Sequence, residues 1–347
     1  MSEDVVIRKS GRAGHITLDR PDALNALTAG MSITIEIALD DWRDDDAVDL
    51  VILDAKGTKA FCAGGDIAKL YADGRAGNFD LSRAFWRQEY RLNLKIARYA
   101  KPVVAFMQGF TMGGGVGLGG HASHRIVGDS SKIAMPECGI GLIPDVGGSY
   151  LLGRAPGETG AYLGLTGARM GAADAIYAGF ADHYVPEDTW DDLKSTLLQD
   201  GDVAAIAAAS QPPTGGILAA RQSDIDRLFS AETLSGIDQA LAAEDAEFSQ
   251  AARKNFTKGA PLALACALRA IRAARGGTLS EALAREFRFA YRSQEQGDLI
   301  EGIRAQIIDR DFTPKWRHEN LDVAEHEIAE MLADLGPFDW TPTGDTP

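Results

Sequence analysis

The chain has 347 residues, of which 45% are hydrophobic and 24% are charged, a composition typical of globular proteins. Its formal net charge of −15 argues against a general nucleic-acid binder and against a protein that lies on acidic membrane surfaces. No apolar run reaches the roughly 18 residues that a membrane-spanning helix needs. We therefore expect a globular protein of one large or two ordinary domains, without nucleic-acid or membrane partners.

The three cysteines, Cys62, Cys138 and Cys266, are odd in number and lie far apart in the sequence. This pattern fits neither a disulfide framework nor the spacing of a zinc site, so it indicates a reducing compartment. The first residues, MSEDVVIRKSG, contain no apolar signal core and no arginine-rich amphipathic presequence. These features predict a cytoplasmic protein.

The first part of the chain predicts short strands that alternate with helices. Residues 5–19 form two β-rich runs around a glycine-containing turn, as in a hairpin. Residues 25–42 and 79–100 carry apolar side chains at helical spacing. Residues 49–55 and 101–109 are short apolar runs of the kind buried in parallel sheets.

The pattern changes in the second half of the chain. Residues 160–186 predict two helices and a last strand, and residues 187–347 are nearly all helical in pattern. We divide the chain into an α/β core, residues 1–198, and a helical C-terminal region, residues 199–347. The final segment, TPTGDTP, is expected to be irregular.

Two glycine-rich segments each lie between a predicted strand and a predicted helix: FCAGGD at residues 61–66 and MGGGVGLGG at residues 112–120. Gly115, Gly117 and Gly120 spell the G-x-G-x-x-G of a dinucleotide site. That motif needs its first glycine at the turn that ends the strand, which is not the case here. Glycine also lets backbone N–H groups approach a ligand, and two such donors form an oxyanion hole. Either segment alone could equally serve a tight turn or close helix packing.

Acidic residues are the candidate groups for proton transfer. The G-x-S-x-G serine motif is absent from the sequence and the six histidines show no evident triad, so carboxylates are the better candidates. Glu137 and Asp145 are eight residues apart in a segment of Gly and Pro turns, which could bring both into one pocket. From the residues alone, they could also be loop acids that cap a helix or pair with Arg125 or Arg154.

Several motifs together resemble the enoyl-CoA hydratase/isomerase (crotonase) superfamily. The resemblance is carried by RPDALNAL, KAFCAGGDI, GFTMGGGVGL and MPECGIGLIPDVGG. Three further segments are more similar to its 3-hydroxyisobutyryl-CoA hydrolase branch: FWRQEYRLN, IPDVGGSYLLGR and EGIRAQIIDRDFTPKW. The resemblance covers nearly the whole chain, and the ordered set of motifs is specific although no single motif is.

The resemblance implies an α/β fold, a right-handed spiral of ββα turns followed by a helical region. It implies an acyl-CoA substrate whose thioester carbonyl is held by the backbone N–H groups of Gly65 and Gly114. By similarity, Glu137 stands beside that carbonyl as a nucleophile or as a general base on water. Asp145 would orient water or the acyl 3-hydroxyl group and share the proton transfer. Glu89 would contact the substrate from a helix, whereas its alternative is a solvated charge on a helix face.

Position 117 distinguishes the reactions of the superfamily. Members that add water to an enoyl thioester use two glutamates, and the first lies three residues after the oxyanion glycine, where this chain has Gly117. Glu137 matches the second glutamate, and glycine cannot transfer a proton. We therefore expect an acyl-CoA thioester hydrolase that acts on 3-hydroxyisobutyryl-CoA in valine breakdown. An enoyl-CoA hydratase or isomerase is the alternative on the same fold, and a non-catalytic acyl-CoA-binding protein is the alternative of another class.

The resemblance also sets expectations for cofactors and assembly. Coenzyme A is part of the substrate, so we expect no separate cofactor and no metal ion. Relatives commonly form trimers or pairs of trimers, which predicts a homo-oligomer. Relatives often carry a basic residue directly after GDI, near the CoA phosphates, whereas this chain has Ala68 followed by Lys69. Trp86 and Tyr90, on the same predicted helix as Glu89, are expected to be core residues.

Overall fold

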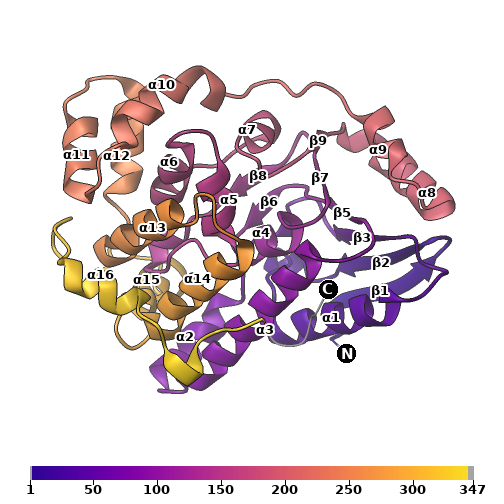
Figure 1. The fold of residues 1–347 in the computed structure, drawn as a ribbon, viewed down its shortest axis with the longest axis horizontal. Helices are drawn as coiled ribbons and strands as arrows, with labels where there is room; N and C mark the ends of the chain where they lie inside the picture. The colour runs from indigo at the N-terminus through magenta and orange to yellow at the C-terminus, as the bar shows by residue number, and fades with distance from the viewer. Residues whose placement is uncertain (1, 343–347) are drawn as a thin grey trace.

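The computed structural model describes residues 2–342 of the chain. Within this range the chain forms a spiral in which successive turns add one strand to each of two sheets (Figure 1). The larger sheet runs in the order β1 (Val5–Ser10), β2 (Ala13–Leu18), β3 (Leu50–Ala55), β5 (Val103–Phe106), β7 (His124–Val127) and β9 (His183–Tyr184). The smaller sheet runs β4 (Ala60–Cys62), β6 (Phe110–Met112) and β8 (Lys132–Ala134).

The strand pairing follows from the sequence pattern. β1 and β2 pair antiparallel, with Val5 opposite Leu18, which confirms the predicted hairpin. The remaining neighbours in both sheets pair in parallel, as crossover connections through helices require. The α/β spiral that the resemblance implied is therefore confirmed.

Both faces of the larger sheet are buried, which explains the continuous apolar runs in its strands. Alternate side chains of β3 point to opposite faces. Leu50 and Ile52 pack with Leu193 in one hydrophobic cluster, whereas Val51 and Leu53 belong to the main core. Leu193 lies on α8 (Trp190–Asp200), which with α9 (Ala204–Ala209) covers the first of these faces.

Helices fill the connections of the spiral and make up the rest of the described chain. Those before β9 are α1 (Ala29–Arg43), α2 (Ile67–Arg75), α3 (Phe79–Ala97), α4 (Gly114–Gly119), α5 (Gly148–Arg154), α6 (Thr159–Thr166) and α7 (Ala172–Tyr177). Those after α9 are α10 (Leu218–Phe229), α11 (Leu234–Ala242), α12 (Glu247–Phe256), α13 (Pro261–Ala273), α14 (Leu279–Ser293), α15 (Leu299–Ile303) and α16 (Glu325–Leu332). Among the described helices, none has both the length and the apolar character to cross a bilayer.

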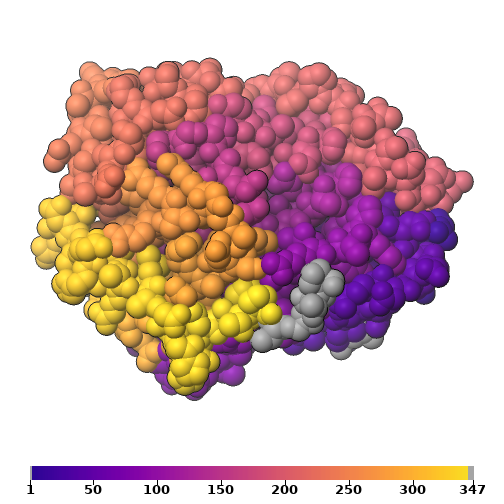
Figure 2. Space-filling model, in the orientation of Figure 1, coloured from indigo at the N-terminus to yellow at the C-terminus, as the bar shows by residue number. Residues whose placement is uncertain are grey.

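The C-terminal helices pack directly on the spiral. α13 contacts α5 and α6, and α14 contacts α3 and α5 (Figure 1). Figure 2 shows the yellow C-terminal segment crossing the outer side of the orange helices. There Arg87 of α3 donates a hydrogen bond to the carbonyl oxygen of Asp339 at 3.1 Å. The contacts of α14 with α3 and α5 place α14 next to the candidate site described below.

The prediction that the second half is nearly all helical is wrong for residues 309–324, which are irregular. A π-helical turn, Arg304–Ile308, ends the preceding helix, and the Arg304 side chain then binds Asp309 and Asp311. Such side-chain bonds compete with helical hydrogen bonding, and Pro314 has no N–H to donate. The division at residue 198 falls within α8 and stays a prediction. Most of the tail predicted to be irregular, residues 343–347, lies outside the described residues.

Candidate active site

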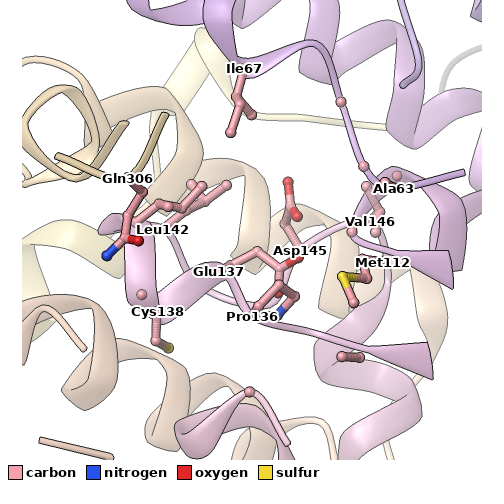
Figure 3. Close-up of a pocket in the computed structure, with 18 of the residues that line it drawn as sticks. Ala63, Ile67, Met112, Pro136, Glu137, Cys138, Leu142, Asp145, Val146 and Gln306 are labelled. Carbon is pink, nitrogen blue, oxygen red and sulfur yellow. The ribbon is translucent and has the colours of Figure 1, made fainter. Parts of the chain in front are cut away.

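A cavity of about 510 Å³ lies between the spiral and the C-terminal helices. Its walls include all the site residues predicted from the sequence: Gly65, Glu89, Gly114, Glu137 and Asp145. These residues come from separate segments of the chain, which the spiral brings to one place. Figure 3 shows Glu137 and Asp145 in the middle of the cavity, with Ala63, Met112 and Val146 to one side and Cys138, Leu142 and Gln306 to the other.

The two glycine-rich segments meet at the cavity wall. Gly65 lies just before α2, and Gly114 is the first residue of α4. A Cβ atom on Gly114 would lie 3.5 Å from the Gly65 nitrogen and 2.6 Å from Glu89 Oε1, so a side chain there would displace the Glu89 carboxyl group. Within residues 2–342, neither the Gly65 nor the Gly114 N–H donates to a protein acceptor. Both N–H groups are therefore available to a ligand, and their role as an oxyanion hole remains a prediction.

Glu137 begins a 3-10 helix, Glu137–Ile140, that follows β8. Its side chain is buried, and its Oε2 atom has no hydrogen-bond partner among the described residues. A Cβ on Gly113 would lie 3.0 Å from Glu137 Oε1, so this carboxyl group sits against the glycine-rich start of α4. Burial raises the pKa of Glu137 well above its usual value, and the nearby Asp145 raises it further.

Asp145 lies three residues before Gly148, the first residue of α5, and is also buried. The Tyr90 hydroxyl donates a hydrogen bond of 2.8 Å to Asp145 Oδ2. Burial raises the pKa of Asp145 to about 7, although the bond from Tyr90 acts in the opposite direction. A carboxyl group that titrates near neutral pH is suited to proton transfer.

Glu89 is not a solvated charge on a helix face, so that alternative is wrong. The residue lies on α3 with an exposed fraction of 2%, and its Oε1 atom has no partner among the described residues. Burial raises the pKa of Glu89 well above its usual value, and Asp145 adds to this shift. An unsatisfied buried carboxyl group in a cavity wall is a group that a ligand can satisfy. Contact with the substrate remains a prediction for Glu89.

The structure explains why position 117 carries no side chain. A Cβ on Gly117 would lie 2.7 Å from Asn93 Nδ2 and 2.9 Å from Val146 Cβ. Asn93 and Val146 therefore fill the space that a glutamate at this position would need. Both amide atoms of Asn93 are buried without a partner among the described residues.

Two polar residues of the site were not predicted from the sequence. Tyr90 is buried as expected of a core residue, but its hydroxyl binds Asp145. Glu286, on α14, is fully buried and accepts hydrogen bonds from the N–H groups of Gly147 and Ser149. A signal for Glu286 exists in the sequence, because this acid stands on the apolar face of α14 beside the buried Phe287.

Relatives often carry a basic residue directly after the GDI motif, whereas in this chain the positively charged residues that line the cavity come from other segments. Lys69 is exposed and pairs with Asp73 Oδ2 at 3.2 Å. Arg169 and Lys258 line the cavity itself. Within residues 2–342, His, Cys, Asp and Glu side chains form no group of three that could hold a metal ion.

Comparisons with known proteins agree with this architecture. A family model described as enoyl-CoA hydratase/isomerase matches residues 13–332. A protein of Danio rerio named 3-hydroxyisobutyryl-CoA hydrolase, mitochondrial, is 38% identical over 97% of this chain and 91% of its own length. The protein of the same name from Homo sapiens is 36% identical over 97% of this chain and 90% of its own length.

Solved structures resemble the whole chain. A crystal structure of an enoyl-CoA hydratase from Rhodobacter sphaeroides 2.4.1 is 52% identical, with a TM-score of 0.94, over 98% of this chain and 100% of that one. A carnitinyl-CoA dehydratase from Mycobacterium thermoresistibile is 43% identical, with a TM-score of 0.94, over 99% of this chain and 100% of that one. The names of these relatives differ in the reaction but share the acyl-CoA substrate class.

The expectation of a cytoplasmic location is corrected by the curated relatives, which are named mitochondrial. The cysteine pattern indicates only a reducing environment and does not identify the compartment. Family model, relatives and solved structures all match nearly the full chain. The chain therefore belongs to the enoyl-CoA hydratase/isomerase family.

Proposed function

We propose that this protein hydrolyses the thioester bond of 3-hydroxyisobutyryl-CoA, releasing 3-hydroxyisobutyrate and coenzyme A, a step in valine breakdown. The proposal is supported by several curated relatives of that name at 35–39% identity over most of the chain. One structural observation carries it. The cavity presents two unpaired backbone N–H groups beside buried Glu137 and Asp145, and it has no room for a second glutamate at position 117.

The chemistry begins with the thioester carbonyl. Its oxygen accepts hydrogen bonds from the N–H groups of Gly65 and Gly114, which stabilise the negative charge that develops on it. Removing one such donor in well-studied enzymes costs about 2.7–4 kcal/mol of transition-state stabilisation. The glycine backbone lets both donors approach without a Cβ atom in the way.

Glu137 acts in one of two ways, as the nucleophile itself or as a base that activates water. As a nucleophile, its carboxylate attacks the carbonyl carbon, the C–S bond breaks and a mixed anhydride forms, which water then hydrolyses. As a general base, it takes a proton from water while the water oxygen attacks, and the C–S bond breaks directly. In both routes the proton that the leaving thiolate finally takes up comes from the attacking water, and it passes through the ionised Asp145 carboxylate. Asp145, with a pKa of about 7, is placed to relay it.

The remaining assignments complete the proposal. Coenzyme A enters as part of the substrate, and the reaction uses no separate cofactor, so prolonged dialysis against a chelator should leave the rate unchanged. Arg169 and Lys258 line the cavity and could offer positive charge to the CoA phosphates. We also propose a trimer or a pair of trimers in solution, which light scattering would reveal.

A thiol-release assay over a panel of acyl-CoA esters tests the function. We expect free thiol with 3-hydroxyisobutyryl-CoA, and slower release with esters that lack the 3-hydroxyl group. An enoyl-CoA hydratase, the activity named for one relative, would instead remove enoyl absorbance without releasing thiol. Binding of CoA esters without any turnover would indicate a non-catalytic acyl-CoA-binding protein and would also contradict the proposal.

A further inference from the structure

The turn that carries Asp145 has an unusual backbone. Val146 has a φ of 52° and Gly147 a φ of 79°, so two successive residues adopt the left-handed region. Valine rarely adopts this conformation, because its branched side chain clashes with the backbone there. Such a strained residue persists only when the surrounding structure holds it in place.

Buried polar contacts hold each residue of this turn. The Tyr90 hydroxyl donates to the Asp145 carboxylate at 2.8 Å. His121 Nε2 donates to the Val146 carbonyl oxygen, also at 2.8 Å. Burial lowers the pKa of His121 to about 4, so its ring is neutral and keeps the Nε2–H tautomer that this bond needs.

Glu286 fixes the far side of the turn. Its Oε2 accepts from the Gly147 N–H at 2.7 Å, and its Oε1 accepts from the Ser149 N–H at 2.9 Å and from the Ser149 hydroxyl. The residue has an exposed fraction of 0%, and its partners among the described residues are two backbone N–H groups and a hydroxyl rather than a cation. Burial raises the pKa of Glu286 to about 7. An unpaired buried carboxyl group is costly, so its presence calls for a reason other than stability.

The acceptor geometry supplies that reason. A carboxylate is acceptor-only and offers both oxygens to donors, whereas an amide of the same shape offers one oxygen and turns an NH₂ group toward the other donor. Only an acid can therefore bind Gly147 and Ser149 on both sides at once. We propose that Glu286 is a positioning residue, which holds the turn from Asp145 to Ser149 so that the Asp145 carboxyl group faces the cavity beside Glu137. This inference rests on the proposed hydrolase function and adds a residue to it.

Glu286→Gln is the variant that tests the proposal. We expect kcat for thiol release to fall about 10- to 100-fold, because small misplacements of a catalytic group have effects of this size. We expect KM to stay within about threefold, since Glu286 is not among the residues that line the cavity. The acid limb of the pH profile should move to lower pH, because one negative charge near Asp145 is lost. The other groups whose charge is felt near Asp145 are Glu89 and Tyr90 on α3 and Glu137.

Asp174→Asn is the matched control. Asp174 lies on α7, is buried, and accepts hydrogen bonds from the N–H groups of Ile217 and Leu218 at 2.8 and 2.9 Å. Like Glu286, Asp174 binds two backbone N–H groups of a neighbouring segment, but it is not among the residues that line the cavity. Both N–H groups donate to Oδ1, which asparagine also offers, so Asp174→Asn removes a buried acid and keeps both bonds. It should leave kcat and the pH profile of the folded protein unchanged.

A double-mutant cycle tests whether Glu286 acts through Asp145. If both Tyr90 and Glu286 position Asp145, the losses in kcat of Tyr90→Phe and Glu286→Gln should be less than multiplicative in the double variant. Fully multiplicative effects would contradict the proposal. So would a Glu286→Gln protein with wild-type kcat and pH profile, or an Asp174→Asn protein with an equal loss of kcat.

Two further measurements keep the test decisive. If Glu286→Gln does not fold, Ser149→Ala removes one contact of Glu286 and leaves both N–H bonds, and it should lower kcat about threefold without changing KM. An unchanged kcat in Ser149→Ala would then overturn the proposal. If the wild-type protein releases no thiol, the proposed function fails by itself. The pKa of the Asp145 carboxyl group, followed by NMR in wild type and Glu286→Gln, would still show whether Glu286 controls Asp145.

Discussion

At the scale of single residues, the site combines groups that are costly to bury. Glu89, Glu137 and Asp145 are carboxyl groups enclosed in one cavity wall, and two of them have an oxygen without a hydrogen-bond partner among residues 2–342. Burial raises the pKa of each, and Asp145 raises the pKa values of Glu89 and Glu137 further. Unsatisfied groups with shifted pKa values are typical of sites that gain their partners when a substrate binds.

Glu137→Gln should lower kcat by about 10²–10⁴, because the amide neither attacks a carbonyl nor accepts a proton at neutral pH. The variant should still bind the CoA ester, since the backbone donors of Gly65 and Gly114 are unchanged. Rates and calorimetric titration measure the two effects. Glu158→Gln changes the same residue type in an ion pair with Arg275 outside the cavity, and it should behave as wild type. Equal rates for wild type and Glu137→Gln would contradict the assignment.

The pKa of Asp145 also predicts how stability depends on pH. Its folded-state value of about 7 lies above the ordinary 3.8, so the folded protein holds the proton more tightly than the unfolded chain does. Stability from this group is therefore complete below pH 3.8 and falls as the pH rises to about 7. Asp145→Asn, which carries no charge, should be more stable than wild type by about 1–4 kcal/mol at pH 8. Denaturant unfolding at pH 5 should show a smaller gap between the two proteins, and an equal gap at both pH values would refute this origin.

At the scale of elements, α3 and α4 together set the chemistry of the cavity. α3 presents Glu89 to the cavity, Tyr90 to Asp145 and Asn93 to Gly117. These contacts follow from helical geometry, in which side chains three to four residues apart share one face. α4 can approach α3 and β4 closely because its residues are largely glycine.

Tyr90→Phe should move the acid limb of the kcat profile to higher pH. The hydroxyl of Tyr90 lowers the pKa of Asp145, so its loss leaves the carboxyl group protonated over a wider range. We expect a loss of activity at pH 7 that recovers at higher pH. Tyr99→Phe removes a hydroxyl that donates to the Leu39 carbonyl oxygen at 2.6 Å, away from the cavity, and should leave the profile unchanged. A Tyr90→Phe profile that overlays the wild type would exclude this role.

Gly117→Glu should not convert the enzyme into a hydratase. The added side chain would clash with Asn93 and Val146, so we expect a loss of at least about 1–3 kcal/mol of stability, typical of overpacked cores. Thermal unfolding and loss of enoyl-CoA absorbance measure the two outcomes. Gly171→Glu is a suitable control, because Gly171 is not among the cavity-lining residues and a Cβ there would meet nothing within 4 Å. Hydratase activity in Gly117→Glu would mean that the glycine alone decides the reaction.

At the scale of the whole molecule, the sequence was sufficient to predict the α/β fold and part of the candidate site. The β-rich runs around a glycine turn located the hairpin, continuous apolar runs located β3 and β5, and helical spacing located α1 and α3, because each of these elements buries a regular set of side chains. The motifs predicted Gly65, Gly114, Glu137 and Asp145 as site residues, and all four line one cavity in the structure.

The contacts that the sequence did not reveal are those made between distant segments. Glu286 meets Gly147 across 139 positions of sequence, so no local pattern could pair them. The irregular segment 309–324 was missed because side-chain bonds of Arg304, rather than glycine or proline content, end the helix before it. The compartment was predicted wrongly because free cysteines describe the chemistry of a compartment and not its identity.

The infrared spectrum of a bound substrate tests the central claim most directly. A 3-hydroxyisobutyryl-CoA labelled with ¹³C at the thioester carbonyl would be bound to Glu137→Gln, which should hold it without turnover. Two N–H donors from Gly65 and Gly114 should polarise this carbonyl and move its stretching band to lower frequency than in water. A band that stays at its position in free solution would show that these amides do not hold the carbonyl, and would contradict the account.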